Sequence, residues 1–239
     1  MDKKIVSVVI VTYNAEKTLQ HCLDSIYNQA SKAIEIIVID GASKDRTVAI
    51  LEENTAKLDY WKSEKDAGIY DAMNKALEFV TTDRVFFLGA DDHLLPDFSA
   101  MLQVLHDPKA IYYANVVYKK ARHSGYITPY YQAKSGIFHQ SIIYPVTVFK
   151  KYKYNVNYRI AADYALNMKC YQDPEFHFKY VDYTITEYND TGISSNTIDK
   201  EFEKDKSKLI FDNFGLKIWL RYQFRQFKSR LRSQKINDD

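Results

Sequence analysis

Two adjacent carboxylates, Asp91 and Asp92, follow an apolar run at residues 84–88 and the dipeptide Gly89-Ala90. Ionised carboxylates at the end of a buried strand are costly unless a positive group meets them. A divalent cation bound to a diphosphate would meet them, because such cations take oxygen ligands and bridge phosphates. The alternative is a turn with a helix cap, since Asp is favoured in both.

Polar residues follow two other apolar runs in the same way. Thr12, Tyr13 and Asn14 end the run at 5–12, and residues 40–43, Asp-Gly-Ala-Ser, follow the run at 34–39. In open α/β sheets, ligands bind beyond the carboxyl ends of the strands. Three polar strand ends therefore favour one ligand site over three unrelated caps.

The first 105 residues alternate between strand and helix patterns. The β-branched run at 5–12 is typical of a strand buried on both faces of a parallel sheet. Further strands are expected at 34–39, 60–63 and 84–88, and helices at 15–29, 46–57, 70–80 and from Pro96 to about 105. Asn14 is expected to cap the first helix and Ser43 or Asp45 the second. Short connections between buried strands indicate crossover helices and a parallel, doubly wound sheet.

The pattern after residue 105 is more mixed and more aromatic. Strands are expected at 111–117, 126–131 and 179–188, and a helix at 161–170. A charged helix is expected from near Asn196 or Thr197, with a break at Gly215. We therefore predict one α/β domain with a mostly parallel, doubly wound sheet and a C-terminal helical extension. The chain would divide into a first half at residues 1–105, a second half of the same domain at 106–200, and a helical, basic amphipathic tail at 201–239.

Composition limits the possible partners and compartments. The chain has 239 residues and a net charge of +2, which is too close to neutral to favour nucleic acid. Cys22 and Cys170 are far apart and fit no metal or redox spacing, which favours a reducing compartment. The apolar run near the N-terminus is too short to span a bilayer and lacks a cleavage site. We expect a cytoplasmic protein, peripheral to the inner face of the plasma membrane.

Four segments resemble family 2 glycosyltransferases with the GT-A fold. Residues 6–14 look like the opening strand of that family, and 37–47 are similar to its second strand with the continuation Asp-Gly-x-Ser-x-Asp-x-Thr. Residues 64–75 resemble the segment before the third helix, and Phe-Leu-Gly-Ala-Asp-Asp at 87–92 resembles the metal-binding motif. The order and spacing agree over about residues 5–100. A looser resemblance at 139–141, 162–164 and 192–195 is that of bacterial enzymes that build surface polysaccharides.

The resemblance assigns a nucleotide site to the first half of the chain. Asp40 would accept the imino N–H of a uracil base, a carboxylate contact that also suits thymine or guanine and disfavours cytosine. Thr12, Tyr13 and Asn14 would offer backbone groups and a ring face to the same base. Asp66, Asn74 and Ala90 match positions that line the nucleotide site. Asp71 is a weaker candidate, because it could equally stabilise the N-terminal end of its own helix.

The resemblance also implies a divalent cation, Mn²⁺ or Mg²⁺. Asp91 matches the carboxylate that ligates the cation, and Asp92 is a ligand, a partner of a ligand or the cap of its loop. The family motif often begins with Asp or Asn where this chain has Gly89. That departure weakens a contact to the ribose or around the metal, but the main ligand is present.

An inverting displacement in this family needs a base for the acceptor hydroxyl. Asp163 matches the base position at the start of a helix, although the usual acidic pair is here a single acid. Partial burial is expected to raise its pKa. The alternative is a carboxylate stabilised by the helix dipole. His139 would contact the diphosphate or the acceptor hydroxyl, or it is structural.

The tail from residue 216 carries an apolar stripe beside a basic one. Its seven basic and two acidic residues give 7 − 2 = +5, and the apolar positions are Leu216, Leu220, Phe224, Phe227 and Leu231. A basic amphipathic helix binds anionic bilayers, which would suit an acceptor on a lipid carrier. The alternatives are packing on protein and, less favoured, RNA binding.

We therefore predict a metal-dependent, inverting glycosyltransferase that moves a sugar from a nucleotide diphosphate donor, most plausibly UDP-linked, to a saccharide acceptor in cell-surface polysaccharide synthesis. A nucleotidyltransferase is the enzyme alternative, but the first strand is not followed by a glycine-rich phosphate loop. An oxidoreductase that binds a dinucleotide fails the same test. The third alternative is an inactive scaffold of the same fold, for which Gly89 is the one hint.

Overall fold

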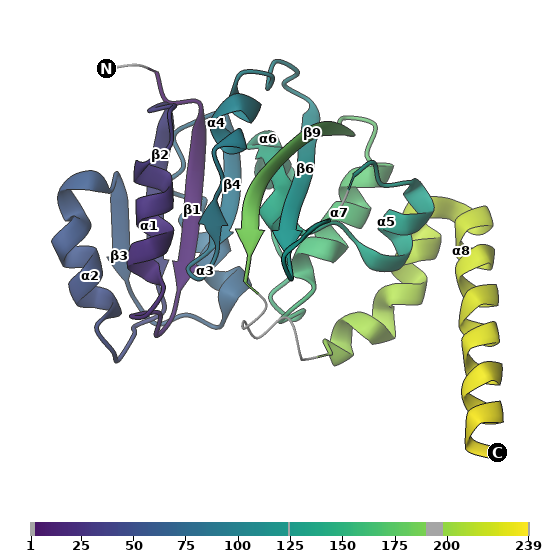
Figure 1. The fold of residues 1–239 in the computed structure, drawn as a ribbon. Coiled ribbons are helices and arrows are strands. Elements are labelled where there is room, and N and C mark those ends of the chain that lie inside the picture. Colours follow the sequence, from purple (N-terminus) through teal and green to yellow (C-terminus); the bar gives the residue numbers. More distant parts are fainter. Residues whose placement is uncertain (1–2, 124, 190–197, 239) are drawn as a thin grey trace.

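Strand β1 (Val6–Thr12) lies within a nine-stranded sheet with helices on both faces (Figure 1). The computed structural model describes residues 3–123, 125–189 and 198–238. The sheet order is β3-β2-β1-β4-β8-β6-β9-β5, and β7 pairs with β6. The strands are β2 (Ile34–Asp40), β3 (Tyr60–Ser63), β4 (Arg84–Gly89), β5 (His93–Leu94), β6 (Ala110–Tyr118), β7 (Ala121–His123), β8 (Ile142–Pro145) and β9 (His177–Tyr188).

The helices cover the two faces of the sheet and bury alternate residues of its strands. Val8 and Ile10 of β1 pack on one face, and Val9 and Val11 on the other. Every residue of β1 and β2 is buried, as expected of a parallel sheet covered on both sides. The helices are α1 (Leu19–Tyr27), α2 (Thr47–Asn54), α3 (Ile69–Ala76), α4 (Asp97–Leu102), α5 (Pro129–Ser135), α6 (Thr147–Lys151), α7 (Ala162–Gln172) and α8 (Lys200–Asp238).

The first half confirms the predicted alternation of strands and helices. Strands β3, β2, β1 and β4 pair in parallel. Beyond β4 the sheet is mixed, because β8 pairs antiparallel with both β4 and β6, whereas β9 runs parallel to β6. The overall architecture is the predicted α/β fold. Cys22 and Cys170 are both buried and free.

The strand predicted at 126–131 is wrong. Helix α5 begins at Pro129, and the Thr128 side chain accepts a hydrogen bond from the Tyr131 N–H at 3.2 Å. A Thr cap followed by Pro at the first helical position outweighs the strand preference of the neighbouring tyrosines. Strands β5 and β8 were not predicted, because runs of two and four residues carry too little periodicity.

Asn14 does not cap a helix, contrary to the prediction. Helix α1 begins at Leu19, and Asn14 has a φ of 52°. Its side-chain oxygen accepts from the Lys44 N–H at 2.8 Å, and its own N–H donates to the Ser43 hydroxyl at 2.8 Å. Asn14 thus joins the loop after β1 to the loop after β2. Asp45, in contrast, does accept the Thr47 N–H at the start of α2, at 3.0 Å.

Helix α8 is a pair of antiparallel arms joined at Gly215, as the predicted break requires (Figure 1). Gly215 has φ 77° and ψ 174°, a conformation that side chains disfavour. We call residues 200–214 the first arm and 216–238 the second arm. The Ser207 hydroxyl accepts from Trp219 and Gln223 and so ties the arms together. The start predicted at Asn196 or Thr197 lies outside the described residues, as does the matched segment 192–195.

Candidate functional site

The carboxyl ends of β1, β2 and β4 meet at one edge of the sheet. The three strands are parallel neighbours, with Thr12 in register with Asp40 and Val11 with Gly89. This register places the polar clusters at 12–14, 40–43 and 89–92 side by side. The predicted convergence of the three strand ends is therefore confirmed.

Asp40 is fully buried and holds this edge together. Its carboxylate accepts the Ser43 hydroxyl, the Ser43 N–H at 3.0 Å and the Ser63 hydroxyl at 2.5 Å. These bonds join the end of β2 to its own loop and to the end of β3. Because Asp40 is fully buried, a nucleobase could reach its carboxylate only if the surrounding side chains moved.

Asp66 and Tyr13 lie around Gly41 at the open side of the same edge. A Cβ on Gly41 would sit 2.7 Å from Asp66 Oδ2 and 3.3 Å from the Tyr13 ring. Asp66 Oδ1 accepts the Gly68 N–H at 2.8 Å, and the Tyr13 side chain is 63% exposed. Gly41 therefore lets a carboxylate and an exposed ring come together. Within the described residues, the buried Thr12 hydroxyl nearby has no hydrogen-bond partner.

Asn74 and Asp71 are occupied by contacts within the protein. Asn74 exchanges two hydrogen bonds with the Tyr154 backbone, at 2.9 and 3.1 Å, and so fixes the loop after α6. Asp71 accepts the Ala67 N–H and pairs with Lys75 at 3.2 Å. The Ala67 N–H and the Lys75 contact lower the pKa of Asp71 against the opposing effect of burial. Asp71 thus closes the turn before α3, which agrees with the alternative that it stabilises the N-terminal end of its own helix.

Asp92 and Asp91 have different surroundings despite being adjacent. Asp92 is 1% exposed, and its oxygens accept the Gly89 N–H at 3.2 Å and the Asn189 N–H at 2.9 Å. Burial raises the pKa of Asp92 to about 6, although the Asn189 N–H opposes this effect. Burial also raises the pKa of the Asp91 carboxyl. Asp92 therefore shapes the turn, and Asp91 is the carboxylate better suited to a cation.

Gly89 leaves room for both carboxylates. A Cβ at this position would lie 2.6 Å from Asp92 Oδ2 and 3.0 Å from Asp91 Oδ1. The Asp92 carboxylate thus occupies the space that a side chain at residue 89 would take. Ala90, between Gly89 and Asp91 in the chain, is buried.

We expect Gly89→Ala to reduce metal-dependent activity by roughly 10- to 100-fold, because the added Cβ displaces both carboxylates. Titration of activity with Mn²⁺ would show the shift to higher metal concentration. Nucleotide binding without metal serves as the control for folding. An unchanged metal dependence would contradict this account of the turn.

His139 and Asp163 form the second part of the site. His139 Nδ1 lies 3.5 Å from Asp163 Oδ2, and the Tyr70 hydroxyl donates to Asp163 Oδ1 at 2.6 Å. Burial opposes charge on both groups, but their mutual attraction outweighs it: the pKa of His139 is raised and that of Asp163 is lowered. The prediction of a raised pKa for Asp163 is therefore wrong, because a histidine and a tyrosine hydroxyl stabilise the carboxylate.

His139 also connects the ion pair to the aspartates at the end of β4. Asp92 and Asp91 both contribute to the raised pKa of His139. The side chain of the next residue, Gln140, lowers the pKa of Asp92. The metal motif and the predicted base thus belong to one site, with short helix η2 (His139–Ser141) between them.

Sequence reasoning missed Tyr70, Gln140 and Asn189. Tyr70 fits the apolar face of α3, so its pattern indicated a core residue. Asn189 donates to Asp92, and Gln140 lowers the pKa of Asp92, both from distant segments, and no local spacing could reveal these interactions. The available signal was that Tyr70 and Gln140 lie within the segments 64–75 and 139–141, which resemble the family.

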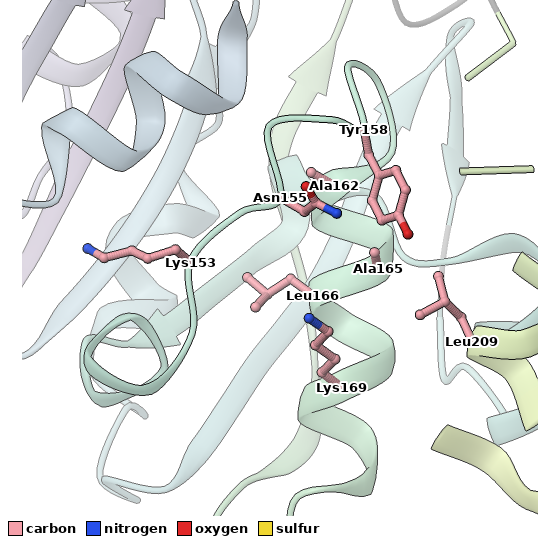
Figure 2. Close-up of a pocket in the computed structure, with 8 residues that line it drawn as sticks. All are labelled: Lys153, Asn155, Tyr158, Ala162, Ala165, Leu166, Lys169 and Leu209. Carbon is pink, nitrogen blue, oxygen red and sulfur yellow. The ribbon is translucent and has the colours of Figure 1, made fainter. Parts of the chain in front are cut away.

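A small hollow, drawn in Figure 2, lies away from these residues. It is formed by the loop after α6, by α7 and by the first arm, and includes Lys153, Tyr158, Leu166 and Leu209. None of the predicted site residues lines it. The predicted site residues lie instead at and around the polar edge of the sheet.

Comparisons with known proteins identify the family of this chain. The family model described as Glycosyl transferase family 2 matches residues 7–171. A PGL/p-HBAD biosynthesis glycosyltransferase of Mycobacterium bovis is 33% identical over 210 residues, which cover 83% of this chain and 82% of that protein.

Solved structures share the fold. S. aureus TarS in complex with UDP-GlcNAc has a TM-score of 0.68 at 18% identity, covering 94% of this chain and 73% of that chain; the chain spans 39% of a longer TarS. A mannosyltransferase of Pyrobaculum calidifontis in complex with GDP-Man and Mn²⁺ has a TM-score of 0.60 at 20% identity, covering 78% and 57%. With the ordered strand ends and the match over residues 7–171, these findings show that the chain belongs to glycosyl transferase family 2.

Proposed function

We propose that this glycosyltransferase is metal-dependent and inverting, and that it transfers a sugar from a nucleotide diphosphate donor, preferably UDP-linked, to a saccharide on a lipid carrier. Residues 1–105 bind the donor and 106–200 the acceptor. The observation that carries the proposal is that His139, which lies 3.5 Å from Asp163, is also close enough to Asp91 and Asp92 for both carboxylates to raise its pKa. The relative named for PGL/p-HBAD biosynthesis and the UDP complexes of TarS support it. Such a reaction would serve cell-surface polysaccharide synthesis.

Asp163 acts as the base of a direct displacement. Its carboxylate takes the proton of the acceptor hydroxyl while the hydroxyl oxygen bonds to the anomeric carbon, and the bond to the nucleoside diphosphate breaks. Tyr70 and His139 hold the carboxylate in place and ionised. Attack opposite to the leaving group inverts the anomeric configuration.

Asp91, supported by Asp92, would hold a divalent cation. Among the described residues no three His, Cys, Asp or Glu side chains form a metal cluster. Mg²⁺ commonly takes one or two carboxylates and completes its shell with waters and substrate phosphates. The raised pKa of Asp91 marks a carboxylate that gains from a nearby cation. When bound, the cation offsets charge on the departing diphosphate.

Asp66 and Tyr13, instead of Asp40, contact the nucleobase of the donor directly. Asp66 is part-exposed beside an exposed ring, whereas every Asp40 oxygen is already bonded within the protein. A carboxylate at this place accepts an imino N–H, which uracil and guanine both have. Asp40 then acts by fixing the ends of β2 and β3, and the Thr12-Tyr13-Asn14 turn positions the ring.

We expect Asp66→Ala to weaken UDP binding by roughly tenfold or more with little loss of stability, because it removes the proposed acceptor of the imino N–H, whereas the Gly68 N–H that Asp66 also accepts is exposed to water. Asp40→Asn should instead lower the free energy of unfolding by about 1–3 kcal/mol, since the amide has one acceptor oxygen for the three donors that the carboxylate accepts. Calorimetry and thermal melting of both variants separate the two effects. Weaker UDP binding by an Asp40→Asn variant that is as stable as the wild type would instead support a direct contact between Asp40 and the nucleobase.

The second arm of α8 binds an anionic membrane surface in this proposal. Its stripe residues Leu216, Leu220, Phe224, Phe227 and Leu231 are 45–59% exposed. Tyr222 packs on the body, and Arg221 stacks on Tyr130 at 3.8 Å, so the base of the arm is anchored. The arm extends toward the edge of the sheet at which β9 ends (Figure 1). No helix in the described part of the chain has the length and hydropathy of a membrane span.

We expect Phe224→Asp with Phe227→Asp to release the protein from vesicles containing phosphatidylglycerol, because the exposed apolar stripe is interrupted. Vesicle sedimentation should show at least a tenfold loss of bound protein, with unchanged UDP binding. Phe211→Asp, at an exposed position of the first arm, is the matched control. Equal sedimentation of all variants would exclude the membrane role.

A donor screen tests the activity itself. The wild-type protein is incubated with a panel of UDP-, GDP- and dTDP-sugars and Mn²⁺, and released nucleoside diphosphate and product masses are measured. Release of UDP from one UDP-sugar is the expected result. In a parallel incubation with a sugar phosphate and a nucleoside triphosphate, release of pyrophosphate would identify a nucleotidyltransferase. A lack of nucleotide binding with metal would identify an inactive scaffold.

A further inference from the structure

Four aromatic side chains form a half-buried cluster beside the reaction centre. Tyr118 lies 5.3 Å from Tyr188 and 5.8 Å from Phe138 between ring centroids, and His123 lies 5.5 Å from Tyr118. Phe138 and Tyr188 are 5.9 Å apart. None of these four residues belongs to the predicted site.

The topology brings this cluster to the edge that carries the site. Strands β6 and β9 run in the same direction as β4, because β8 is antiparallel to both β4 and β6, and β9 is parallel to β6. Tyr118 and Tyr188 are the last residues of β6 and β9 and lie in register with each other. They therefore lie at the same edge as Asp91.

Two direct neighbours of the cluster belong to the site. Phe138 precedes His139, whose ring lies 3.5 Å from Asp163. Tyr188 precedes Asn189, whose N–H donates to Asp92 at 2.9 Å. The rings thus adjoin both the predicted base and the metal motif, where an acceptor hydroxyl must enter.

The hairpin between β6 and β7 adds positive charge to this cluster. Lys119 and Lys120 form its two-residue turn with φ of 50° and 61°, and both side chains are exposed. Turns of this kind favour Asn-Gly, and positive φ costs other residues roughly 1–2 kcal/mol each. Lys119 Nζ lies 5.1 Å from the Tyr118 ring. The two lysines therefore occupy turn positions whose positive φ is unfavourable for their backbone.

We propose that Tyr118, Phe138, Tyr188 and the lysine turn form the acceptor subsite, and that it takes a sugar linked to a lipid through a diphosphate. The apolar face of the sugar packs on the rings, and Lys119 and Lys120 meet the diphosphate as point charges. This inference rests on the proposed function and adds to it the residues that select a charged, carrier-linked acceptor over a free sugar.

The test measures binding of two probes by calorimetry in the presence of UDP and Mn²⁺. One probe is farnesyl-diphosphate-linked N-acetylglucosamine, and the other is the methyl glycoside of the same sugar. Tyr118→Ala should weaken binding of both at least tenfold. Lys119→Asn with Lys120→Gly, which suits the turn, should weaken only the diphosphate probe tenfold and leave the methyl glycoside within twofold.

Tyr131→Ala and Lys134→Ala are the matched controls, because this exposed ring and lysine lie 5.3 Å apart on α5, in no ring contact with the cluster. UDP affinity should be unchanged in every variant, which also confirms folding. Equal effects of the cluster and control variants, or failure of the wild type to bind the probes while it binds UDP, would overturn the acceptor subsite. Failure to bind UDP would overturn the proposed function and this inference with it.

Discussion

Asp91→Ala should reduce sugar transfer on the order of a thousandfold or more while the fold stays intact. Cation-based stabilisation of a leaving group contributes several kcal/mol, and each 1.4 kcal/mol changes the rate about tenfold. The turn does not depend on Asp91, because the Asp92 side chain accepts both the Gly89 and the Asn189 N–H. Steady-state kinetics, together with calorimetry of UDP with and without Mn²⁺, would measure the loss.

Asp92→Ala provides the matched comparison at the neighbouring position. It removes the acceptor of two backbone N–H groups and should lower the free energy of unfolding by about 1–3 kcal/mol. Thermal melting should show a lower transition temperature for this variant than for Asp91→Ala. Normal turnover and normal metal dependence of Asp91→Ala would refute its assignment as the metal ligand.

Asp163→Asn should lower kcat by roughly 10²- to 10⁴-fold, the usual contribution of a general base. The amide has the shape of the carboxylate and can still accept the Tyr70 hydroxyl, so UDP binding should change little, although the loss of the ion pair with His139 should lower stability. Single-turnover measurements with donor and acceptor would isolate the chemical step. A variant with wild-type turnover would show that another group takes the proton.

The His139–Asp163 pair also predicts a dependence on pH. The pKa of Asp163 is lowered, so its contribution to stability is present above the ordinary Asp value and is lost as pH falls through the lowered value. The pKa of His139 is raised, so its contribution is present below the ordinary His value and is lost as pH rises through the raised one. Both contributions are therefore present between the two ordinary values.

The pH dependence of the activity should also be determined by the His139–Asp163 pair. His139→Gln removes the positive charge beside Asp163, so the acid limb of kcat/KM should move to higher pH. The UDP affinity at neutral pH is the control. An acid limb that does not move would show that His139 has no influence on the base.

The first half of the fold could be predicted because its signals are local. Buried parallel strands are continuous apolar runs, and their helices have apolar residues at helical spacing, as in β1 and α1. The second half was harder to predict because its signals conflict. Tyrosines around Pro129 favour a strand, yet the Thr128 cap starts α5. Strand β8 has four residues and finds its place only between β4 and β6.

The candidate site shows the same limit. Asp91 and Asp163 could be identified from motif positions, but the sequence did not reveal that Asp40 is enclosed by Ser43 and Ser63. Nor did it reveal that Gly41 lets Asp66 approach, since residues 41 and 66 are neighbours only through the sheet. The sign of the Asp163 pKa shift likewise depends on His139, a contact between distant segments.

The amino-acid order by itself determined the parallel strands, the acidic residues at their ends and the break at Gly215, because each depends on neighbours along the chain. Only the tertiary structure decided which of those acids are enclosed and which are open, and which distant rings and lysines gather beside them. Burial and charge pairing depend on which residues the fold brings together. An aspartate side chain therefore joins two strand ends at position 40 and is an anion stabilised by a histidine at position 163.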